Sequence, residues 1–315
     1  MTGDPVRADI YTRITDRIIA DLERGVRPWM KPWSAKNAEG RINQPLRVNG
    51  ERYRGINVLI LWSEALANGY TNSVWMTFRQ AIELGGHVRR GEHGTVVVFA
   101  SKFQKVETTD EGEEIARTIP FLRGYTTFNV GQIDGLPDRF YHPTDVHPLP
   151  SVERVADAEE FVVNTAADIR HGGIEAFYAP STDRIQMPMF ESFCDAQAYY
   201  GVLLHELTHW TSHPSRLARD FGRKRSVDAA YATEELVAEI GSAFVCADLG
   251  LALEPREDHA AYIGSWLTAL RNDRRMIFVA AGHAQRAADY LHGLQNLGVG
   301  GKAMGCLPNP MAQAA

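Results

Sequence analysis

Cysteine is scarce in this chain of 315 residues, and a long hydrophobic run is absent. The three cysteines, Cys194, Cys246 and Cys306, have no CxxC spacing, so we expect reduced thiols packed in the interior. No stretch of about 18 apolar residues occurs, which excludes a membrane-spanning helix. The N-terminal residues have no apolar signal core and the chain has no repeat of solenoid period, so we expect a cytoplasmic protein without a repeat architecture.

Lysine is also scarce, since 27 of the 33 basic residues are arginine, which suits planar, bidentate recognition of anions. The formal net charge of −6 conceals a split between the two parts of the chain. Through Lys105 the net charge is +6, from 16 basic and 10 acidic residues, and from Val106 onward it is −12. This asymmetry suggests an anion-binding part joined to a part with a different task.

The first part of the chain predicts helices followed by a small antiparallel sheet. Apolar residues at four-residue spacing, from Ile10 to Leu22, define one face of a helix that Gly25 ends. The later segments change from helical patterns to β-branched and aromatic runs. We therefore expect helices over residues 4–24, 53–68 and 73–84, and strands over residues 94–105 and 118–130.

A proline-rich stretch separates this part from the second one. We expect a first domain over residues 1–136, a linker over 137–150, a second domain over 151–297 and a tail over 298–315. The second domain predicts helices over residues 152–170, 195–212, 226–248 and 257–294, the last broken near Asn272, with strands over 174–178 and 184–187. The fold class is thus α+β in two domains, the second of them rich in helices.

The strongest motif is His205-Glu-Leu-Thr-His209, which lies inside an uninterrupted helical pattern. At 3.6 residues per turn the two histidines share one face, about 6 Å apart, and can bind one tetrahedral ion. Glu206 is rotated by about 100° from His205, so it can flank the ion without binding it. That position suits a general base acting on metal-bound water.

A site of this kind needs a third protein ligand, and the next long helical pattern offers acids at positions 234, 235 and 239. Carboxylates on an otherwise apolar helix are costly to bury without a partner. Glu235 and Glu239 share a face at four-residue spacing. We expect Glu235 on the metal and Glu239 hydrogen-bonded to a ligating histidine, whereas Glu234 is equally compatible with a solvated position. Two histidines and a glutamate favour Zn²⁺, with another divalent ion as the alternative.

HELTHW followed by EELVAE resembles the gluzincin branch of the zincin metallopeptidases. This resemblance implies an antiparallel edge strand above the active helix that holds extended peptide, for which residues 174–178 and 184–187 are candidates. It also implies a group that stabilises the oxyanion. Tyr231, His213 and Arg216 are near enough in sequence to qualify, and the sequence does not choose among them.

The first part of the chain combines aromatic and cationic residues in one cluster. Trp29 and Trp33 flank Lys31 in a loop stiffened by prolines, whereas Trp62 lies in an apolar run and is expected in the core. Aromatic faces interleaved with cations are what single-stranded nucleic acid binding requires. With no sequence-reading element in view, we expect weak base specificity and strong salt dependence. The candidate contacts are Arg27, Trp29, Lys31, Trp33, Lys36, Arg47, Arg52, Tyr53, Arg54, Arg89, Arg90 and Lys102.

PWxKPW, YRGIN, WMTFRQAIELGG and GTVVVFASKF, followed by HELTHWTSHPSRLAR and YATEELVAEIGSAF, closely resemble the ArdC family of antirestriction proteins. The resemblance implies a bacterial mobile-element origin, a single-stranded-DNA-binding N-terminal domain, and a zincin-like C-terminal domain. It also implies protection of incoming conjugative DNA from host restriction, with Glu206 as the catalytic acid and base. Plasmid TraC-type primases share a similar N-terminal domain, but nothing here resembles a primase catalytic core.

Three hypotheses follow for the function. In the first, the protein binds single-stranded DNA, and also double-stranded DNA as a further candidate, while a zinc peptidase domain acts on a host restriction or defence protein. In the second, the metal is structural and shielding of DNA is the whole function. In the third, the acidic second domain mimics DNA, although it has no acidic run longer than two residues, which argues against mimicry.

Overall fold

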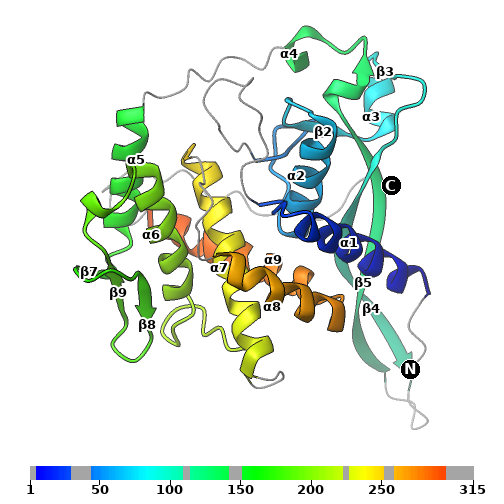
Figure 1. Cartoon of the computed structure of the whole chain (residues 1–315). Helices are drawn as coiled ribbons and strands as arrows, with labels where there is room; N and C mark the ends of the chain where they lie inside the picture. The colour runs from blue at the N-terminus through cyan, green and yellow to red at the C-terminus, as the bar shows by residue number, and fades with distance from the viewer. Residues whose placement is uncertain are drawn as a thin grey trace.

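The computed structural model of the chain describes residues 5–29, 44–108, 114–141, 151–222, 227–251 and 259–295. The first part of the chain forms a long two-stranded ribbon crossed by a helix, and the second part forms a group of helices beside it (Figure 1). The predicted α+β class is confirmed. Within the described residues, no helix has both the length and the apolar character that a bilayer crossing requires.

The described residues of the first part form the helices α1 (Pro5–Glu23), α2 (Ile56–Asn68), α3 (Phe78–Glu83) and α4 (Asp138–Tyr141). The predicted apolar face of α1 is buried, with Ile18 at 1 % exposure. Helix α2 ends as predicted at Gly69, whose φ of 68° is left-handed and therefore suits glycine. Helix α4 falls inside the predicted linker, whose remaining residues 142–150 lie outside the described part, as does the predicted tail.

A four-stranded sheet has the order β1 (Leu46–Arg47), β2 (Val74–Met76), β5 (Glu114–Asn129) and β4 (Thr95–Thr108). Strands β4 and β5 pair antiparallel from Thr95↔Thr127 to Thr108↔Glu114, which confirms both predicted strands and extends them. In a second, two-stranded sheet, β3 (His87–Val88) pairs antiparallel with β6 (Ile133–Asp134). The 3₁₀ helix η1 (Val130–Gln132) directly precedes β6 in the chain.

The helix predicted over residues 73–84 is wrong in its first half. Residues 74–76 form β2, because Trp75 pairs with Asn129 of β5, a contact that local propensity does not contain. Helix α3 begins only after Thr77, whose hydroxyl accepts a hydrogen bond from the Gln80 amide while the Gln80 side chain accepts one from the Thr77 amide. This capping box fixes the start of the helix.

The second part contains α5 (Ser151–Asn164), α6 (Ala196–Trp210), α7 (Val227–Asp248), α8 (His259–Asn272) and α9 (Met276–Gln295). The break predicted near Asn272 is confirmed. The helix predicted over residues 152–170 is too long, because the backbone turns at Ala166, whose φ is 54°, and continues as a strand. That strand, β7 (Asp168–His171), pairs parallel with β9 (Arg184–Met187), and β8 (Phe177–Ala179) pairs antiparallel on the other side of β9.

One continuous hydrophobic core joins the two parts. Trp62 of α2, in the core as predicted, packs edge-on against Phe244 of α7 with ring centroids 5.8 Å apart. The Thr15 hydroxyl of α1 donates to the Arg274 carbonyl at 2.7 Å. Cys246 is buried in this core as predicted, whereas Cys194 is exposed, contrary to the prediction. The helix that carries the predicted third metal ligand therefore also packs against the N-terminal part.

Candidate metal centre

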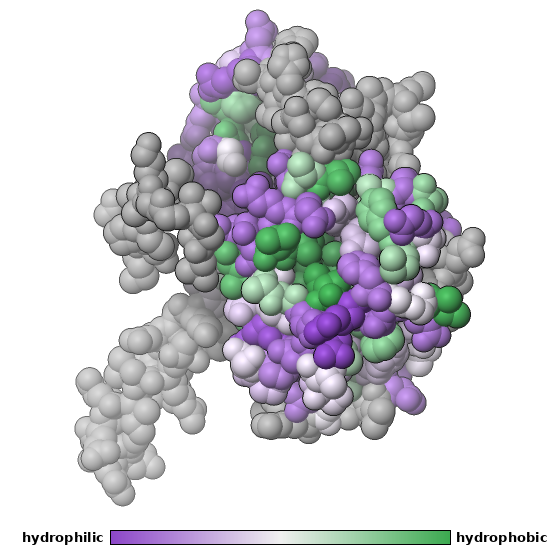
Figure 2. All heavy atoms as spheres, turned by 90° about the vertical axis from the view of Figure 1, so that its left-hand side faces the viewer, coloured by the Kyte–Doolittle hydropathy of each residue, from purple (hydrophilic) through white to green (hydrophobic). Residues whose placement is uncertain are grey.

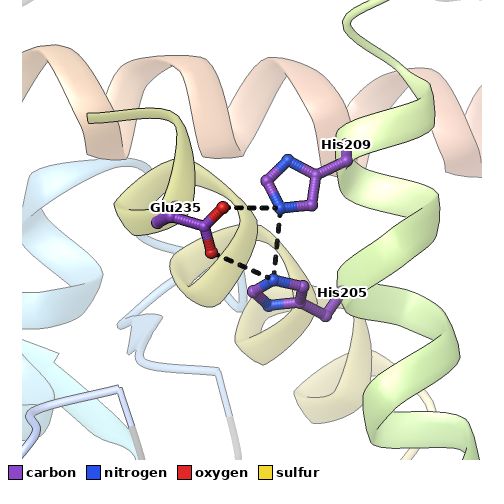
Figure 3. A group of neighbouring side chains, drawn as sticks. All are labelled: His205, His209 and Glu235. Carbon is purple, nitrogen blue, oxygen red and sulfur yellow. Dashed lines mark hydrogen bonds and ion pairs between the residues drawn. The ribbon is translucent and has the colours of Figure 1, made fainter. Parts of the chain in front are cut away.

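Helix α6 carries the two motif histidines on one face, and helix α7 presents Glu235 to them (Figure 3). The Nε2 atoms of His205 and His209 lie 3.2 Å apart. The Glu235 carboxylate lies 3.7 Å from His205 Nε2 and 3.5 Å from His209 Nε2. One ligand atom from each residue falls within 4.8 Å of the others, and among the described residues no other such group of three is found. The donor set of two imidazoles and a carboxylate fits a divalent metal.

Each histidine is also held on its other nitrogen by a carboxylate of α7. His205 Nδ1 lies 3.4 Å from Glu239 Oε1, as the sequence predicts for Glu239. His209 Nδ1 lies 3.1 Å from Glu234 Oε1, a role that sequence reasoning missed. A carboxylate on the remote nitrogen fixes the tautomer and orientation of a metal-binding imidazole. Glu235 is thus placed to bind the metal, whereas Glu234 and Glu239 orient the two imidazoles.

Arg219 binds the Glu234 carboxylate and so holds it in place beside His209. This role was not predicted from the sequence. Its guanidinium donates to both Glu234 oxygens at 2.7 and 2.6 Å, to the Thr211 hydroxyl at 3.0 Å and to the Thr208 carbonyl at 2.8 Å. Burial disfavours the ionised form of Glu234, but Arg219 and His209 outweigh it and lower its pKa to about 2. Arg219 follows the helix in a segment without periodicity, so the sequence offers no signal that points it at α7.

The carboxylates around His205 favour positive charge on its imidazole. Burial disfavours a protonated His205, yet the nearby carboxylates of Glu235 and Glu239 outweigh this and raise its pKa to about 10. Burial also opposes ionisation of Glu235, but His205 and His209 lower its pKa. These shifts show that the carboxylates of α7 stabilise positive charge on His205.

Glu206 lines the same cavity, which has a volume of about 410 Å³ and is bounded by β8, α6, α7 and α8. Its side chain is buried and lies on α6 beside the triad rather than in it. Strand β8 and its flanks supply Ala176, Phe177, Tyr178 and Pro180 to the cavity wall. Within the described residues β8 pairs only with β9, so its other edge is unpaired and can pair with an extended chain.

The face around β8 exposes several large apolar side chains. Figure 2, which looks onto the side of the molecule that carries β7, β8 and α6, shows hydrophobic residues in the middle of this face with hydrophilic ones around them. Exposed apolar residues near β8 in the chain are Ile174, Phe177, Met189 and Phe190. Of these four, Phe177 lines the metal cavity, where an exposed apolar side chain suits a partly apolar ligand.

The structure separates the three candidates for an oxyanion-stabilising group. Tyr231 lines the cavity, is 53 % exposed, and its hydroxyl lies 3.2 Å from that of Tyr262. Arg216 is bound to Asp183 and to the Trp210 carbonyl, and its guanidinium lies 3.8 Å from the Trp210 ring centroid. His213 accepts or donates a hydrogen bond at Ser215 and does not line the cavity.

Two aromatic residues of the predicted DNA-binding set are buried, which corrects that prediction. Trp29 has 0 % exposure and packs edge-on against Trp266 of α8 with ring centroids 5.8 Å apart. Tyr53 is 3 % exposed, and the Arg47 guanidinium lies 5.3 Å from its ring centroid. Neither ring offers a face to a base in this structure, because the aliphatic and aromatic core covers both.

Several cations of the same set are bound to carboxylates. Arg52 pairs with Asp248 of α7 and Arg54 with Asp289 of α9, so both fasten the first part to the second. Arg89 binds Glu92 at 2.8 Å and Asp134 at 3.3 Å, and Arg47 lies 4.0 Å from Glu51. Arg90 is exposed and Arg27 is half-buried. Lys31, Trp33 and Lys36 lie outside the described residues, and of Lys102 only its backbone place in β4 is described.

The sequence and the structure of this chain both match known proteins. Residues 8–128 match the model of the N-terminal domain of the anti-restriction factor ArdC, and residues 156–283 match a zincin-like metallopeptidase model. The metal-free crystal structure of the antirestriction protein ArdC from plasmid R388 superposes with a TM-score of 0.77 at 45 % identity, covering 92 % of this chain and 98 % of that one. A Mn(II)-bound structure of the same protein gives a TM-score of 0.74 at 44 % identity, covering 91 % and 98 %.

Relatives of known sequence agree with this match. The uncharacterized protein y4eC of Sinorhizobium fredii is 46 % identical over 294 residues, covering 91 % of this chain and 93 % of that protein. A DNA primase TraC of Escherichia coli is 38 % identical over 306 residues, but this chain spans only 27 % of its length. The similarity to TraC therefore concerns one portion of a much longer protein.

Proposed function

Because this chain belongs to the ArdC family of antirestriction proteins, we propose that it binds single-stranded DNA and hydrolyses peptide bonds of a host restriction or defence protein. The observation that carries the proposal is the convergence of His205, His209, Glu235 and Glu206 on one cavity with an open strand edge at its wall. We assign DNA binding to residues 1–136 and hydrolysis to residues 151–297, on either side of a linker over 137–150.

The metal proposed for this centre is Zn²⁺, because two histidines and one glutamate are its usual ligands in hydrolytic sites. A divalent ion bound there supplies Lewis-acid activation of water and of a carbonyl group. Glu239 and Glu234 hold the two imidazoles in the orientation that presents Nε2 to the ion. The related ArdC of plasmid R388 binds Mn(II), so manganese is the second candidate.

The remaining steps belong to residues of this chain. The edge of β8 aligns an extended peptide by main-chain hydrogen bonds, and Phe177 contacts an apolar side chain of that peptide. Glu206 accepts the proton of the attacking water and delivers it to the leaving amine. Tyr231 donates a hydrogen bond to the developing oxyanion, because it alone of the three candidates lines the cavity.

The second candidate function is shielding of single-stranded DNA with a structural metal. It is favoured by the ion pair between Arg219 and Glu234, which joins the segment after α6 to α7 and would stabilise the fold whether or not hydrolysis occurs. In that case the centre holds two helices together, and the DNA-binding part performs the whole function.

A Glu206→Gln variant distinguishes the two functions. It removes the base while keeping the shape of the side chain, so the fold and the metal content should stay as in the wild type. Protection of conjugated DNA should then fall to the level of a strain without the protein. The matched control is Glu191→Gln, an exposed carboxylate outside the cavity. Full protection by Glu206→Gln would reject hydrolysis and leave shielding.

A further inference from the structure

A second cavity of about 250 Å³ lies in the N-terminal part, between α1, α2 and the start of β4. Its floor consists of the buried side chains Ile14, Ile18 and Ile60. Its volume is below the roughly 300 Å³ at which pockets for drug-sized molecules begin, so it fits one small ring system rather than a large ligand. Isoleucine side chains from both α1 and α2 line it, and an apolar lining suits the face of a flat ring.

Unpaired polar groups of β4 border this apolar floor. The amide and carbonyl of Val98 are bonded by the Asn57 side chain at 2.8 Å each, so they face away from β5. Val96 lies two residues earlier and turns its N–H and C=O to the same edge, where no described residue bonds them. The Thr95 hydroxyl, in a residue that is 6 % exposed, also has no hydrogen-bond partner among the described residues.

A donor and an acceptor side by side match the edge of a nucleobase, and leaving them unpaired costs free energy. The rim of the cavity adds positive charge. Arg13 and Arg17 stand at four-residue spacing on α1, and both line the cavity. Arg17 is held by Glu64 and by the Ser63 hydroxyl, whereas Arg13 is exposed and pairs with no described carboxylate. One exposed guanidinium is therefore available for a phosphate.

We propose that this cavity receives one base of bound single-stranded DNA, with the backbone edge of Val96 and the Thr95 hydroxyl on the base and Arg13 on its phosphate. The inference rests on the DNA-binding half of the proposed function and names the place where that half is carried out. It replaces the stacking faces of Trp29 and Tyr53, which are buried, with an aliphatic slot. Because the contacts are few, base preference is weak.

Photocrosslinking of the intact wild-type protein tests the site directly. An oligothymidylate that carries 5-bromodeoxyuridine should crosslink to peptides of α1, α2 or β4 that border the cavity. Crosslinks found only elsewhere would overturn the proposal. An oligonucleotide with abasic positions throughout should bind at least about tenfold more weakly than its normal counterpart, since each inserted base contributes a stacking term. Equal affinity would also overturn it.

Two variants distinguish a failure of the proposed base cavity from a failure of single-stranded DNA binding itself. Ile14→Trp fills the cavity and should weaken binding of the oligothymidylate about tenfold, whereas Arg13→Ala should lower the salt slope by about one. Arg286→Ala, an exposed arginine on α9, is the matched control. If the wild type does not bind the oligonucleotide, the DNA-binding function itself fails. If the wild type binds and both variants equal the control, only the base cavity fails.

Competition by a free nucleotide tests whether the cavity binds a base of a DNA strand or a single nucleotide. Deoxythymidine monophosphate should displace the oligonucleotide only at millimolar concentrations, because it offers one base and one phosphate. Displacement at micromolar concentrations would reject the strand as the occupant and point to a nucleotide-binding site. Displacement by an unrelated extended peptide, but not by the nucleotide, would show that the β4 edge pairs with protein and would overturn the proposal.

Discussion

Trp29, the last described residue before position 44, packs edge-on against Trp266 of α8, with ring planes 73° apart. Trp266 in turn lies against Tyr262 at 6.2 Å between ring centroids, and the Tyr262 hydroxyl is 3.2 Å from that of Tyr231. A series of aromatic contacts thus leads from the N-terminal part to the wall of the metal cavity. Trp29 supports the fold and the cavity wall rather than a base.

Replacing Trp29 by alanine should therefore destabilise the whole protein. Truncation of a fully buried tryptophan leaves a large void, so the free energy of unfolding should fall by about 3–5 kcal/mol. Trp29→Phe should retain much of that stability, because it keeps an aromatic ring against Trp266. Urea denaturation checks both variants. A Trp29→Ala protein of wild-type stability and reduced affinity for single-stranded DNA would restore the nucleic-acid role.

Arg219→Met should weaken the metal centre although Arg219 touches no metal ligand. Its side chain is 1 % exposed, and its loss leaves the half-buried Glu234 carboxylate with only its contact to His209, at a cost of about 1–3 kcal/mol. Glu234 then orients His209 less well, and metal affinity should fall about 10- to 100-fold. Isothermal titration with Zn²⁺ measures this. Unchanged affinity in a folded Arg219→Met protein would show that the Glu234 contact is incidental.

The metal-free protein should lose stability in mildly alkaline solution. Burial works against protonation of His205, but Glu235 and Glu239 raise its pKa from 6.5 to about 10. A raised pKa contributes stability that is fully present below pH 6.5 and is lost as the pH rises through about 10. Chemical denaturation in EDTA at several pH values measures the slope. A His205→Gln protein should lack this component, and identical slopes for both proteins would contradict the assignment.

The arginines of the N-terminal part should divide into two groups. Arg52 is neutralised by Asp248, so Arg52→Ala should leave the salt dependence of single-stranded DNA binding unchanged. Arg90 is exposed and has no ion pair among the described residues, so Arg90→Ala should lower the slope of log Kd against log salt by about one. The two slopes are read from fluorescence anisotropy titrations. A reversed order would return Arg52 to the DNA-binding surface.

Elements with a local cause could be predicted from the sequence. Helix α6 follows from its periodicity, and its start at the N-cap Asp195 follows from the hydrogen bond that its side chain accepts from Ala198. The i, i+4 spacing of His205 and His209 and the acids on α7 were enough to anticipate the triad, because helix geometry alone sets which side chains share a face. The resemblance to a known family then implied the antirestriction role.

Contacts between distant segments could not be predicted in this way. Strand β2 exists because Trp75 pairs with β5, and β7 exists because it pairs with β9, so local patterns gave helix in both places. The ion pairs of Arg52 and Arg54 depend on how the two parts pack, and charge counting treated both residues as free cations. Arg219 was missed for the same reason, since only the fold brings it to Glu234.

The most direct test of the account is the metal content of two variants beside the wild type. Glu235 is proposed to bind the ion, and Glu206 is proposed to lie beside it without binding. Elemental analysis after dialysis should therefore find about one divalent ion per chain in the wild type and in Glu206→Gln, and almost none in Glu235→Gln. Loss of the ion from Glu206→Gln, with full retention in Glu235→Gln, would contradict the assignment of ligand and base.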